Sequence, residues 1–256
     1  MNYLVKWGRV IFTCYSFLLF LLVFFIIFPA VVISSFFGRI KGGNAIYSLC
    51  RFWADAVFLF CGLRHRTIYE APNDIKKPSV FVFNHISYID IPVIMKAIRK
   101  QPVRILGKAE MAKVPLFGFL YRKAVVMVER DNPINRAKSV VQLKALLKKN
   151  ISIVISPEGT FNTTGQPLKA FYDGAFRIAI ETQTPIRPIL FLDMHDRMSN
   201  ERFFSMNPGK CRVVYLDPID TTGMSIVETP ALKQKVYDLM EAGLIKYKAS
   251  WIKSMP

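Results

Sequence analysis

A long, uninterrupted apolar stretch near the amino terminus limits what this chain can fold into. Residues 10–37 contain no charged residue, no Asn or Gln and no Gly. As one helix the stretch would be roughly 42 Å long, against a hydrocarbon core of about 30 Å. It therefore predicts a helix that can reach across a bilayer, which Pro29 is expected to kink or end early.

A cleaved signal peptide is the competing interpretation, because Lys6 and Arg9 precede the apolar stretch. The stretch is long for the apolar part of a signal peptide, and no convincing small-residue cleavage site follows it. More apolar sequence also comes directly after it. We therefore favour a retained membrane anchor.

The second apolar stretch, residues 45–63, is interrupted only by Arg51 and Asp55, whose spacing would let them pair on one helical face. With a glycine-containing turn at residues 38–43, the two stretches predict a membrane-embedded helical hairpin. Basic residues flank both ends, so the positive-inside rule leaves its orientation open. The alternative is that residues 45–63 form a core helix of the following domain.

Past the hairpin, apolar β-branched runs alternate with helical patterns. This alternation predicts an α/β fold with a mixed, mostly parallel sheet flanked by helices. We expect two parts, a membrane-anchoring helical pair at residues 1–63 and a catalytic domain at residues 64–256. The expected strands cover residues 79–83, 103–106, 124–128, 151–155, 186–192 and 212–216, and the expected helices cover residues 91–99, 134–149, 173–183 and 231–248.

A histidine leaves the end of the first expected strand, and an aspartate follows it five residues later, in the sequence Asn-His-Ile-Ser-Tyr-Ile-Asp at residues 84–90. A neutral imidazole at His85 can take a proton from an alcohol, and Asp90 can fix its tautomer. Five residues is the wrong interval for one helical face, so the chain must turn between them. A structural alternative is that Ser87 and Asp90 form a helix-capping box, or that Asp90 is itself the cap.

Four ordered blocks resemble those of the glycerolipid acyltransferase superfamily, which includes the lysophosphatidate acyltransferases. The resemblance extends over residues 79–192. It implies an enzyme that moves a fatty acyl group from a thioester to the hydroxyl of a lysolipid, with lysophosphatidate the first choice of acceptor. The blocks are His-x4-Asp at residues 85–90, three pieces at residues 108–111, 114–118 and 126–130, Ser-Pro-Glu-Gly-Thr at residues 156–160, and Thr-Pro-Ile-Arg-Pro-Ile at residues 184–189.

The resemblance also implies roles for single residues. His85 would be the general base and Asp90 its orienting partner. No serine or cysteine nucleophile fits as well, so we favour direct transfer without an acyl-enzyme. Glu158, Gly159 and Thr160 would help to hold the acceptor, and backbone amides near Gly159 are candidates to stabilise the oxyanion. Glu158 as a helix cap and Gly159 as a plain turn residue remain alternatives. Arg130 is a further candidate, which could bind a phosphate or form a surface salt bridge. Candidates for secondary contacts with the acceptor or donor are Lys108, Gly118, Lys169, Arg177 and Arg187.

Two positions depart from the family pattern. The residue after Glu-Gly-Thr is usually arginine in the family, and here it is Phe161. A family-like Phe-Lys-Lys-Gly-Ala-Phe also becomes Phe-Tyr-Asp-Gly-Ala-Phe at residues 171–176, with Asp173 at a lysine position. Lost positive charge favours a second acceptor class, a lyso-amino-acid lipid or another phosphate-free lysolipid. A membrane-anchored lipid-binding protein that lacks catalysis is the third possibility.

The net charge of +17, from 35 basic and 18 acidic residues, suits anionic partners. Membrane lipid headgroups fit best, and a negatively charged acyl donor, acyl carrier protein or coenzyme A, would feel the same field. Nucleic acid is disfavoured because no motif for it appears. Four scattered cysteines give no zinc-type spacing, so we expect no metal, no cofactor beyond the thioester co-substrate, and a cytoplasmic catalytic face.

Overall fold

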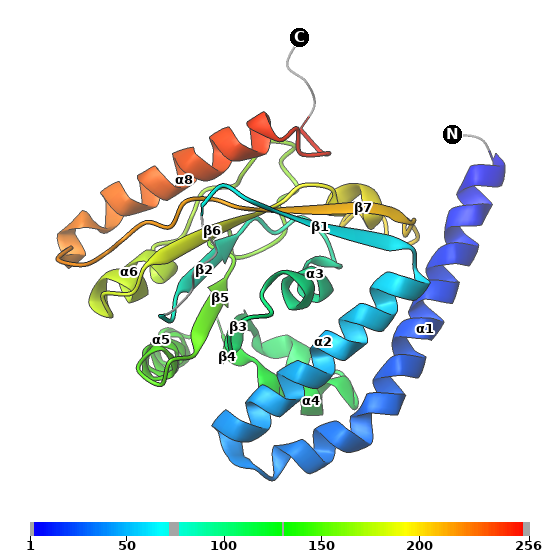
Figure 1. The fold of residues 1–256 in the computed structure, drawn as a ribbon, viewed down its shortest axis with the longest axis horizontal. Helices are drawn as coiled ribbons and strands as arrows, with labels where there is room; N and C mark the ends of the chain where they lie inside the picture. Colours follow the sequence, from blue (N-terminus) through cyan, green and yellow to red (C-terminus); the bar gives the residue numbers. More distant parts are fainter. Residues whose placement is uncertain (1–2, 72–76, 130, 253–256) are drawn as a thin grey trace.

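The computed structural model describes residues 3–71, 77–129 and 131–252, which form a seven-stranded sheet with helices on both faces (Figure 1). The strands are β1 (Leu63–Tyr69), β2 (Val80–Phe83), β3 (Val103–Lys108), β4 (Val126–Val128), β5 (Ser152–Ile155), β6 (Ile186–Phe191) and β7 (Gly209–Tyr215). Their order is β1-β7-β6-β2-β5-β3-β4, and neighbours are parallel except for the antiparallel pair β6 and β7. The predicted mixed, mostly parallel α/β sheet is confirmed.

The helices divide between the two faces of the sheet. They are α1 (Tyr3–Ser35), α2 (Gly43–Phe60), α3 (Asp90–Ala97), α4 (Phe117–Ala124), α5 (Pro133–Leu147), α6 (Gly174–Glu181), α7 (Met194–Arg197) and α8 (Thr229–Lys246), with short turns η1 (Gly38–Gly42), η2 (Ala109–Lys113) and η3 (Ile226–Glu228). Helices α5, α6 and α8 cover one face, whereas α3 and α2 lie on the other (Figure 1). Helix α1 lies outside α2 as the outermost helix of this side.

The six expected strands and four expected helices are all present, with ends shifted by a few residues. The sequence reading missed β1, which begins where we expected the second apolar helix to end. That strand reads Leu-Arg-His-Arg-Thr-Ile-Tyr and lies at the edge of the sheet, where only Leu63 is buried. An edge strand needs little apolar sequence, and charged side chains on it discourage pairing with other chains. Helix α4 was also missed.

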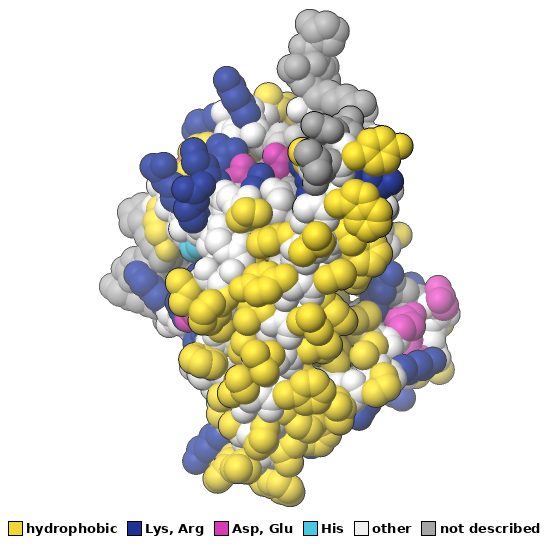
Figure 2. Space-filling view, turned by 90° about the vertical axis from the view of Figure 1, so that its right-hand side faces the viewer, with side chains coloured by type: hydrophobic (Ala, Val, Ile, Leu, Met, Phe, Trp, Pro, Cys, Tyr) yellow, Lys and Arg dark blue, Asp and Glu magenta, His cyan; other side chains and the backbone are white. Residues whose placement is uncertain are grey.

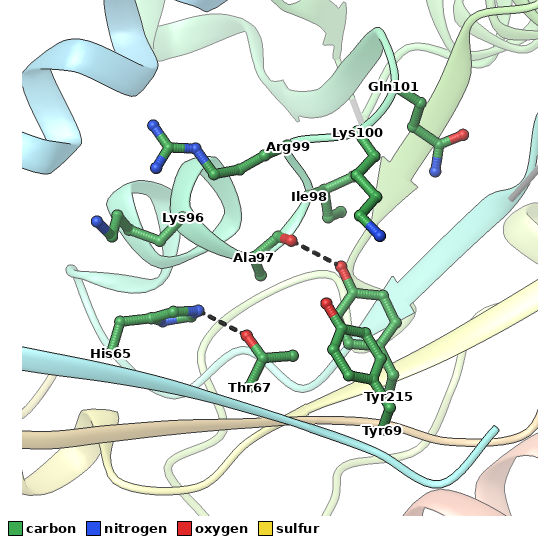
Figure 3. A pocket seen from close by; sticks show the side chains of 10 residues that line it. All are labelled: His65, Thr67, Tyr69, Lys96, Ala97, Ile98, Arg99, Lys100, Gln101 and Tyr215. Atoms are coloured by element: carbon green, nitrogen blue, oxygen red, sulfur yellow. Dashed lines mark hydrogen bonds between the residues drawn. The ribbon is translucent and has the colours of Figure 1, made fainter. Parts of the chain in front are cut away.

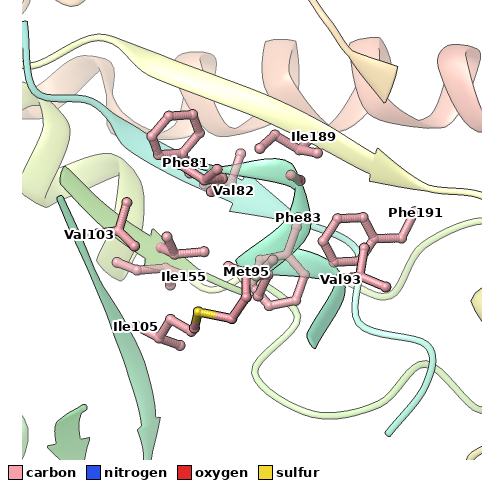
Figure 4. Close-up of a cluster of buried hydrophobic side chains, with 14 of the residues drawn as sticks. Phe81, Val82, Phe83, Val93, Met95, Val103, Ile105, Ile155, Ile189 and Phe191 are labelled. Carbon is pink, nitrogen blue, oxygen red and sulfur yellow. The ribbon is translucent and has the colours of Figure 1, made fainter. Parts of the chain in front are cut away.

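The central strand β2 provides a rigid base for the segment that follows it. All four of its residues are buried, as expected for a parallel strand covered on both faces. Phe81 and Phe83 pack in the core with Met95 of α3 and Phe191 of β6 (Figure 4). The chain therefore leaves the end of β2 from a fixed position.

The two amino-terminal helices pack on each other and on the α/β unit. The indole nitrogen of Trp53 in α2 donates to the carbonyl of Phe20 in α1 at 3.1 Å, and the two rings lie 4.2 Å apart. Buried residues of both helices belong to the same hydrophobic cluster as the sheet. Pro29 does not end α1, because the helix continues to Ser35. A proline removes one amide donor, which the hydrogen bonds on either side can outweigh.

Helix α2 also packs on the α/β unit, as the core-helix alternative anticipated. The expected pair of Arg51 with Asp55 does not form, because both side chains reach residues at the end of α3. Asp55 binds Lys96 at 2.5 Å and also Arg99, and the guanidinium of Arg51 donates to backbone carbonyls of residues 98 and 101. Each of the two side chains therefore binds a residue of another part of the chain, and they do not bind each other.

Among the helices in the described part of the chain, only α1 is long and apolar enough to cross a membrane. Within Val5–Ser35, the most apolar window of 18 residues has a mean hydropathy of 3.0, and only 28% of that window is buried. Figure 2 shows hydrophobic side chains covering most of the face on which α1 lies. Exposed apolar residues of α1 include Ile11, Leu18, Leu22, Ile26 and Ile33.

Candidate active site

His85 and Asp90 meet in the turn between β2 and α3, as the spacing predicted. The Nδ1 atom of His85 lies 2.7 Å from Oδ2 of Asp90. A carboxylate accepts and does not donate, so this contact places the proton on Nδ1 and leaves Nε2 with a free lone pair. The His85 side chain is 22% exposed, whereas Asp90 is fully buried. An accessible imidazole with a free Nε2 can act as a base.

Asp90 holds the turn as well as the histidine. Its Oδ2 also accepts from the backbone amides of Ile86 at 2.8 Å and Ser87 at 2.9 Å. Asp90 is the first residue of α3, where the helix dipole favours negative charge. The capping alternatives are wrong, because Ile89 is the cap residue of α3 and no side chain caps this helix. The Asp90 carboxylate instead holds the turn that precedes the helix.

Glu158 ties the segment after β5 to the histidine. One carboxylate oxygen accepts from the backbone amide of His85 at 2.9 Å, and the other accepts from the backbone amide of Lys169 at 3.0 Å. Neither amide begins a helix, so the helix-cap alternative for Glu158 is wrong. Burial raises the pKa of Glu158 to about 7, and the two amides and the Lys169 ammonium oppose that rise in part. Glu158 thus positions the backbone of His85.

Gly159 lies in a tight turn. Its φ of +73° is in the left-handed region, which favours glycine, and its amide donates to the carbonyl of Ser156 at 3.1 Å. That amide is already engaged and is a poor candidate to stabilise an oxyanion. The plain turn role is therefore sufficient to explain this glycine.

The sequence reading did not single out two asparagines that hold the same turn. Asn84 is buried, and its side chain pairs with the backbone of Phe191 at the end of β6, donating at 3.0 Å and accepting at 2.8 Å. The backbone amide of Asn162 donates to the carbonyl of His85 at 2.8 Å. Asn84 directly precedes His85. The position of a side-chain amide directly after a buried strand is the sequence signal that could have identified its role.

Phe161 stands beside the histidine. Its ring centroid lies 4.2 Å from that of His85 and 5.0 Å from that of Tyr88. An aromatic wall thus lies against the base at the position where the family pattern has arginine. The Lys169 ammonium donates to Thr160 Oγ1, in the third block, at 3.0 Å.

The structure places the remaining predicted residues at different distances from this turn. Lys108 is exposed at the carboxyl end of β3, the same edge of the sheet as His85. Gly118 is a packing residue, because a Cβ there would meet the carbonyl oxygen of Ala112 at 2.1 Å. Arg187 lies early in β6, beside Phe81 in the register, and binds Ser79. Arg177 is exposed on α6, and Arg130 lies outside the described residues.

A cavity of about 330 Å³ lies at the opposite end of α3 from Asp90 (Figure 3). Its walls come from the end of α3 and from one face of β1 and β7. In Figure 3 the Tyr215 hydroxyl reaches the carbonyl of Ala97, and His65 contacts Thr67. Because Asp90 is the first residue of α3 and Ala97 is the last, this cavity is separate from the turn that holds His85 and Asp90, the candidate catalytic turn. No cluster of side chains suited to a metal occurs in the described part of the chain.

Comparison with known proteins agrees with the geometry. The family described as Acyltransferase matches residues 63–192. A Cocos nucifera protein named 1-acyl-sn-glycerol-3-phosphate acyltransferase is 36% identical over 56% of this chain and 46% of its own length. A protein of the same name from Haemophilus influenzae is 29% identical over 77% of this chain and 86% of its own.

The fold also has a solved counterpart. The crystal structure of the 1-acyl-sn-glycerophosphate acyltransferase PlsC from Thermotoga maritima superposes with a TM-score of 0.73 over 96% of this chain and 100% of that one, at 22% identity. This likeness concerns the fold, and the family match covers the catalytic turn, the Glu158 segment and β6. This chain belongs to the acyltransferase family.

Proposed function

We propose that the protein is a membrane-bound O-acyltransferase that moves a fatty acyl group from a thioester to the free hydroxyl of lysophosphatidate, giving phosphatidate. The observation that carries the proposal is the contact of His85 Nδ1 with buried Asp90 at 2.7 Å, which leaves Nε2 free. The names of the curated relatives support the choice of acceptor. The donor is an acyl carrier protein or coenzyme A thioester.

The reaction follows from the free Nε2 atom of His85. The acceptor hydroxyl gives its proton to Nε2 while its oxygen attacks the thioester carbonyl carbon. Asp90 stabilises the imidazolium that forms. When the carbon–sulfur bond breaks, the leaving thiolate takes the proton from Nε2, so the enzyme returns to its starting state. Glu158 and Asn162 keep the His85 backbone in place throughout.

We further propose that residues 1–63 are the membrane-anchoring part and residues 64–256 the catalytic domain. The exposed apolar face of α1 supports anchoring, and the family match begins at residue 63. Helix α2 joins the parts by packing on both α1 and α3. The four cysteines are free, which suits a catalytic face in the reducing cytoplasm. Mass spectrometry of the mature protein tests the anchor, because a new terminus near Ser35 would identify a signal peptide.

A second acceptor class is favoured by Phe161. Its ring lies 4.2 Å from that of His85, and it stands at the position where the family pattern has an arginine that could bind a phosphate. A lyso-amino-acid lipid or another phosphate-free lysolipid would tolerate this aromatic wall. If lysophosphatidate is the acceptor, other cations must hold its phosphate, and Arg130 in the second block is the leading candidate.

The experiment is a thioester-consumption assay with lysophosphatidate and a phosphate-free lysolipid, using the wild type and Arg130→Ala. A guanidinium–phosphate contact is worth about 1.5 to 3 kcal/mol, so Arg130→Ala should lower kcat/KM for lysophosphatidate about ten- to a hundredfold. The phosphate-free acceptor should be affected less. A wild-type preference for that acceptor would replace lysophosphatidate, and turnover of neither acceptor would favour a lipid-binding protein that lacks catalysis.

A further inference from the structure

A line of aromatic rings runs from the catalytic histidine to the surface. The centroid of His85 lies 4.2 Å from Phe161, Phe161 lies 5.0 Å from Tyr88, and Tyr88 lies 6.2 Å from Phe203. Phe204 follows at 5.4 Å from Phe203. Both phenylalanines are at least half exposed, at 50% and 54%. Two adjacent phenylalanines open to solvent are unusual in a surface loop.

The loop that carries these phenylalanines, residues 198–207, is bound to two other parts of the protein. Toward the active site, Ser87 donates to the carbonyl of Met198, and the Asn200 side chain donates to the carbonyl of Asn162 at 3.2 Å. Toward α1, the amide of Met206 donates to Thr13 Oγ1 at 3.1 Å. The loop thus joins the proposed membrane helix to the turn that holds His85.

A cavity of about 290 Å³ lies between this loop and α1. Three arginines line it, Arg9 from α1, Arg197 from α7 and Arg202 from the loop, whereas Asp196 is the single acidic residue in its wall. His195, Ser199, Ser205 and Asn207 complete the lining. An excess of arginine over carboxylate, with hydroxyl and amide groups nearby, suits a phosphate group.

We propose that residues 198–207 form a second membrane-docking element, which binds the surface of an anionic phospholipid bilayer. The arginine-lined cavity takes a lipid phosphate, and Phe203 and Phe204 enter the interface, where aromatic side chains are stable. The proposal rests on the proposed membrane association of α1, to which the loop is bound through Met206 and Thr13. Docking would hold His85 at the depth of the headgroups, so that an acceptor hydroxyl reaches it while the acyl chain stays in the bilayer.

The test uses the full chain reconstituted into vesicles of phosphatidylcholine alone or of phosphatidylcholine with phosphatidylglycerol. Two acceptors are compared, long-chain lysophosphatidate in the bilayer and a short-chain, water-soluble analogue. We expect Arg202→Gln combined with Phe204→Ser to lower turnover of the long-chain acceptor at least fivefold in the anionic vesicles. Turnover of the soluble acceptor should stay within twofold of the wild type.

The matched control is Arg136→Gln combined with Ile134→Ser, which makes the same kinds of change on α5. Both control residues are exposed, and α5 lies on the other face of the sheet from α1 (Figure 1). The control should behave as the wild type with both acceptors. An equal fall for both acceptors in the loop variant would overturn the proposal, and so would an equal fall in the control or an unchanged loop variant.

A readout independent of turnover separates this proposal from the proposed reaction. In Phe204→Trp, the added indole emission should be quenched by brominated phosphatidylglycerol, at least twice as strongly as by an aqueous quencher of equal collisional efficiency. Quenching by the aqueous agent alone would reject docking even if acyl transfer is intact. Quenching by the lipid would support docking even if neither acceptor were turned over.

Discussion

The catalytic turn and the outer face of α1 are held in opposite ways. In the turn, the buried carboxylates Asp90 and Glu158 are tied by directional hydrogen bonds of 2.7 to 3.0 Å. On the outer face of α1, side chains such as Ile26 are exposed and apolar, and their hydrophobic interactions have no preferred direction. The function of the turn therefore depends on exact hydrogen-bond geometry, whereas that of the helix face depends on the total hydrophobicity of many side chains. Single substitutions should be severe in the turn and mild on the helix face.

The largest effect is expected from His85→Ala. General-base catalysis is worth about 10² to 10⁴ in rate, so acyl transfer should fall by that factor while the fold and membrane association remain. Steady-state turnover with a thioester measures it. His65→Ala, a histidine in the separate cavity, is the matched control and should stay within about threefold of the wild type. Near-wild-type turnover of purified His85→Ala would reject the mechanism.

Asp90→Asn should come next, with a loss of about a hundredfold or more in kcat. The amide keeps the shape of the carboxylate but removes the charge that fixes the His85 tautomer and stabilises the imidazolium. The KM of the acceptor should change little, because the Asp90 side chain is fully buried behind His85. A variant whose KM rises while kcat is preserved would show that Asp90 acts on acceptor binding and not on the histidine.

The buried Glu158 should make the stability of the protein depend on pH. Its pKa is about 7 in the folded protein, raised by burial, so the folded state holds a proton that the unfolded state loses above about pH 4.5. Its contribution to stability is therefore greatest below pH 4.5 and falls as pH rises to 7, by up to about 3 kcal/mol.

Denaturant unfolding of the wild type and Glu158→Gln at pH 5 and pH 8 measures this. The free energy of unfolding of the variant should rise relative to that of the wild type between the two pH values. Glu110→Gln, at an exposed carboxylate, is the control and should show no such trend. A constant offset across pH would mean that Glu158 does not titrate in this range.

The smallest effect is expected on the outer face of α1. Ile26→Ser removes one exposed methyl-rich side chain from a long apolar helix, and its transfer into the bilayer should cost about 1 kcal/mol. The protein should remain in the membrane after an alkaline wash. Val31→Ser, at a fully buried position on the same helix, should lower the thermal stability more. Release of Ile26→Ser from the membrane would mean that α1 is only marginally anchored.

Much of the fold could be predicted because periodicity is local. The buried run of β2 and the helical pattern of α5 carry their signals in consecutive residues. The residues of strand β1 carry no such signal. This strand depends on its parallel pairing with β7 over residues 63–69. The separate partners of Arg51 and Asp55 are likewise distant in sequence: Asp55 binds Lys96 of α3, and Arg51 binds carbonyls of the segment that follows α3.

The sequence alone determined the spacing of His85 and Asp90, the apolar length of α1 and the order of the family blocks, because each is a property of nearby residues. Tertiary structure alone decided that Glu158 holds the His85 backbone, that Phe161 lies on its ring, and that residues 198–207 connect this turn to α1. These contacts join residues far apart in the chain. Their partners are chosen by the packing of the sheet and its helices, which no local pattern specifies.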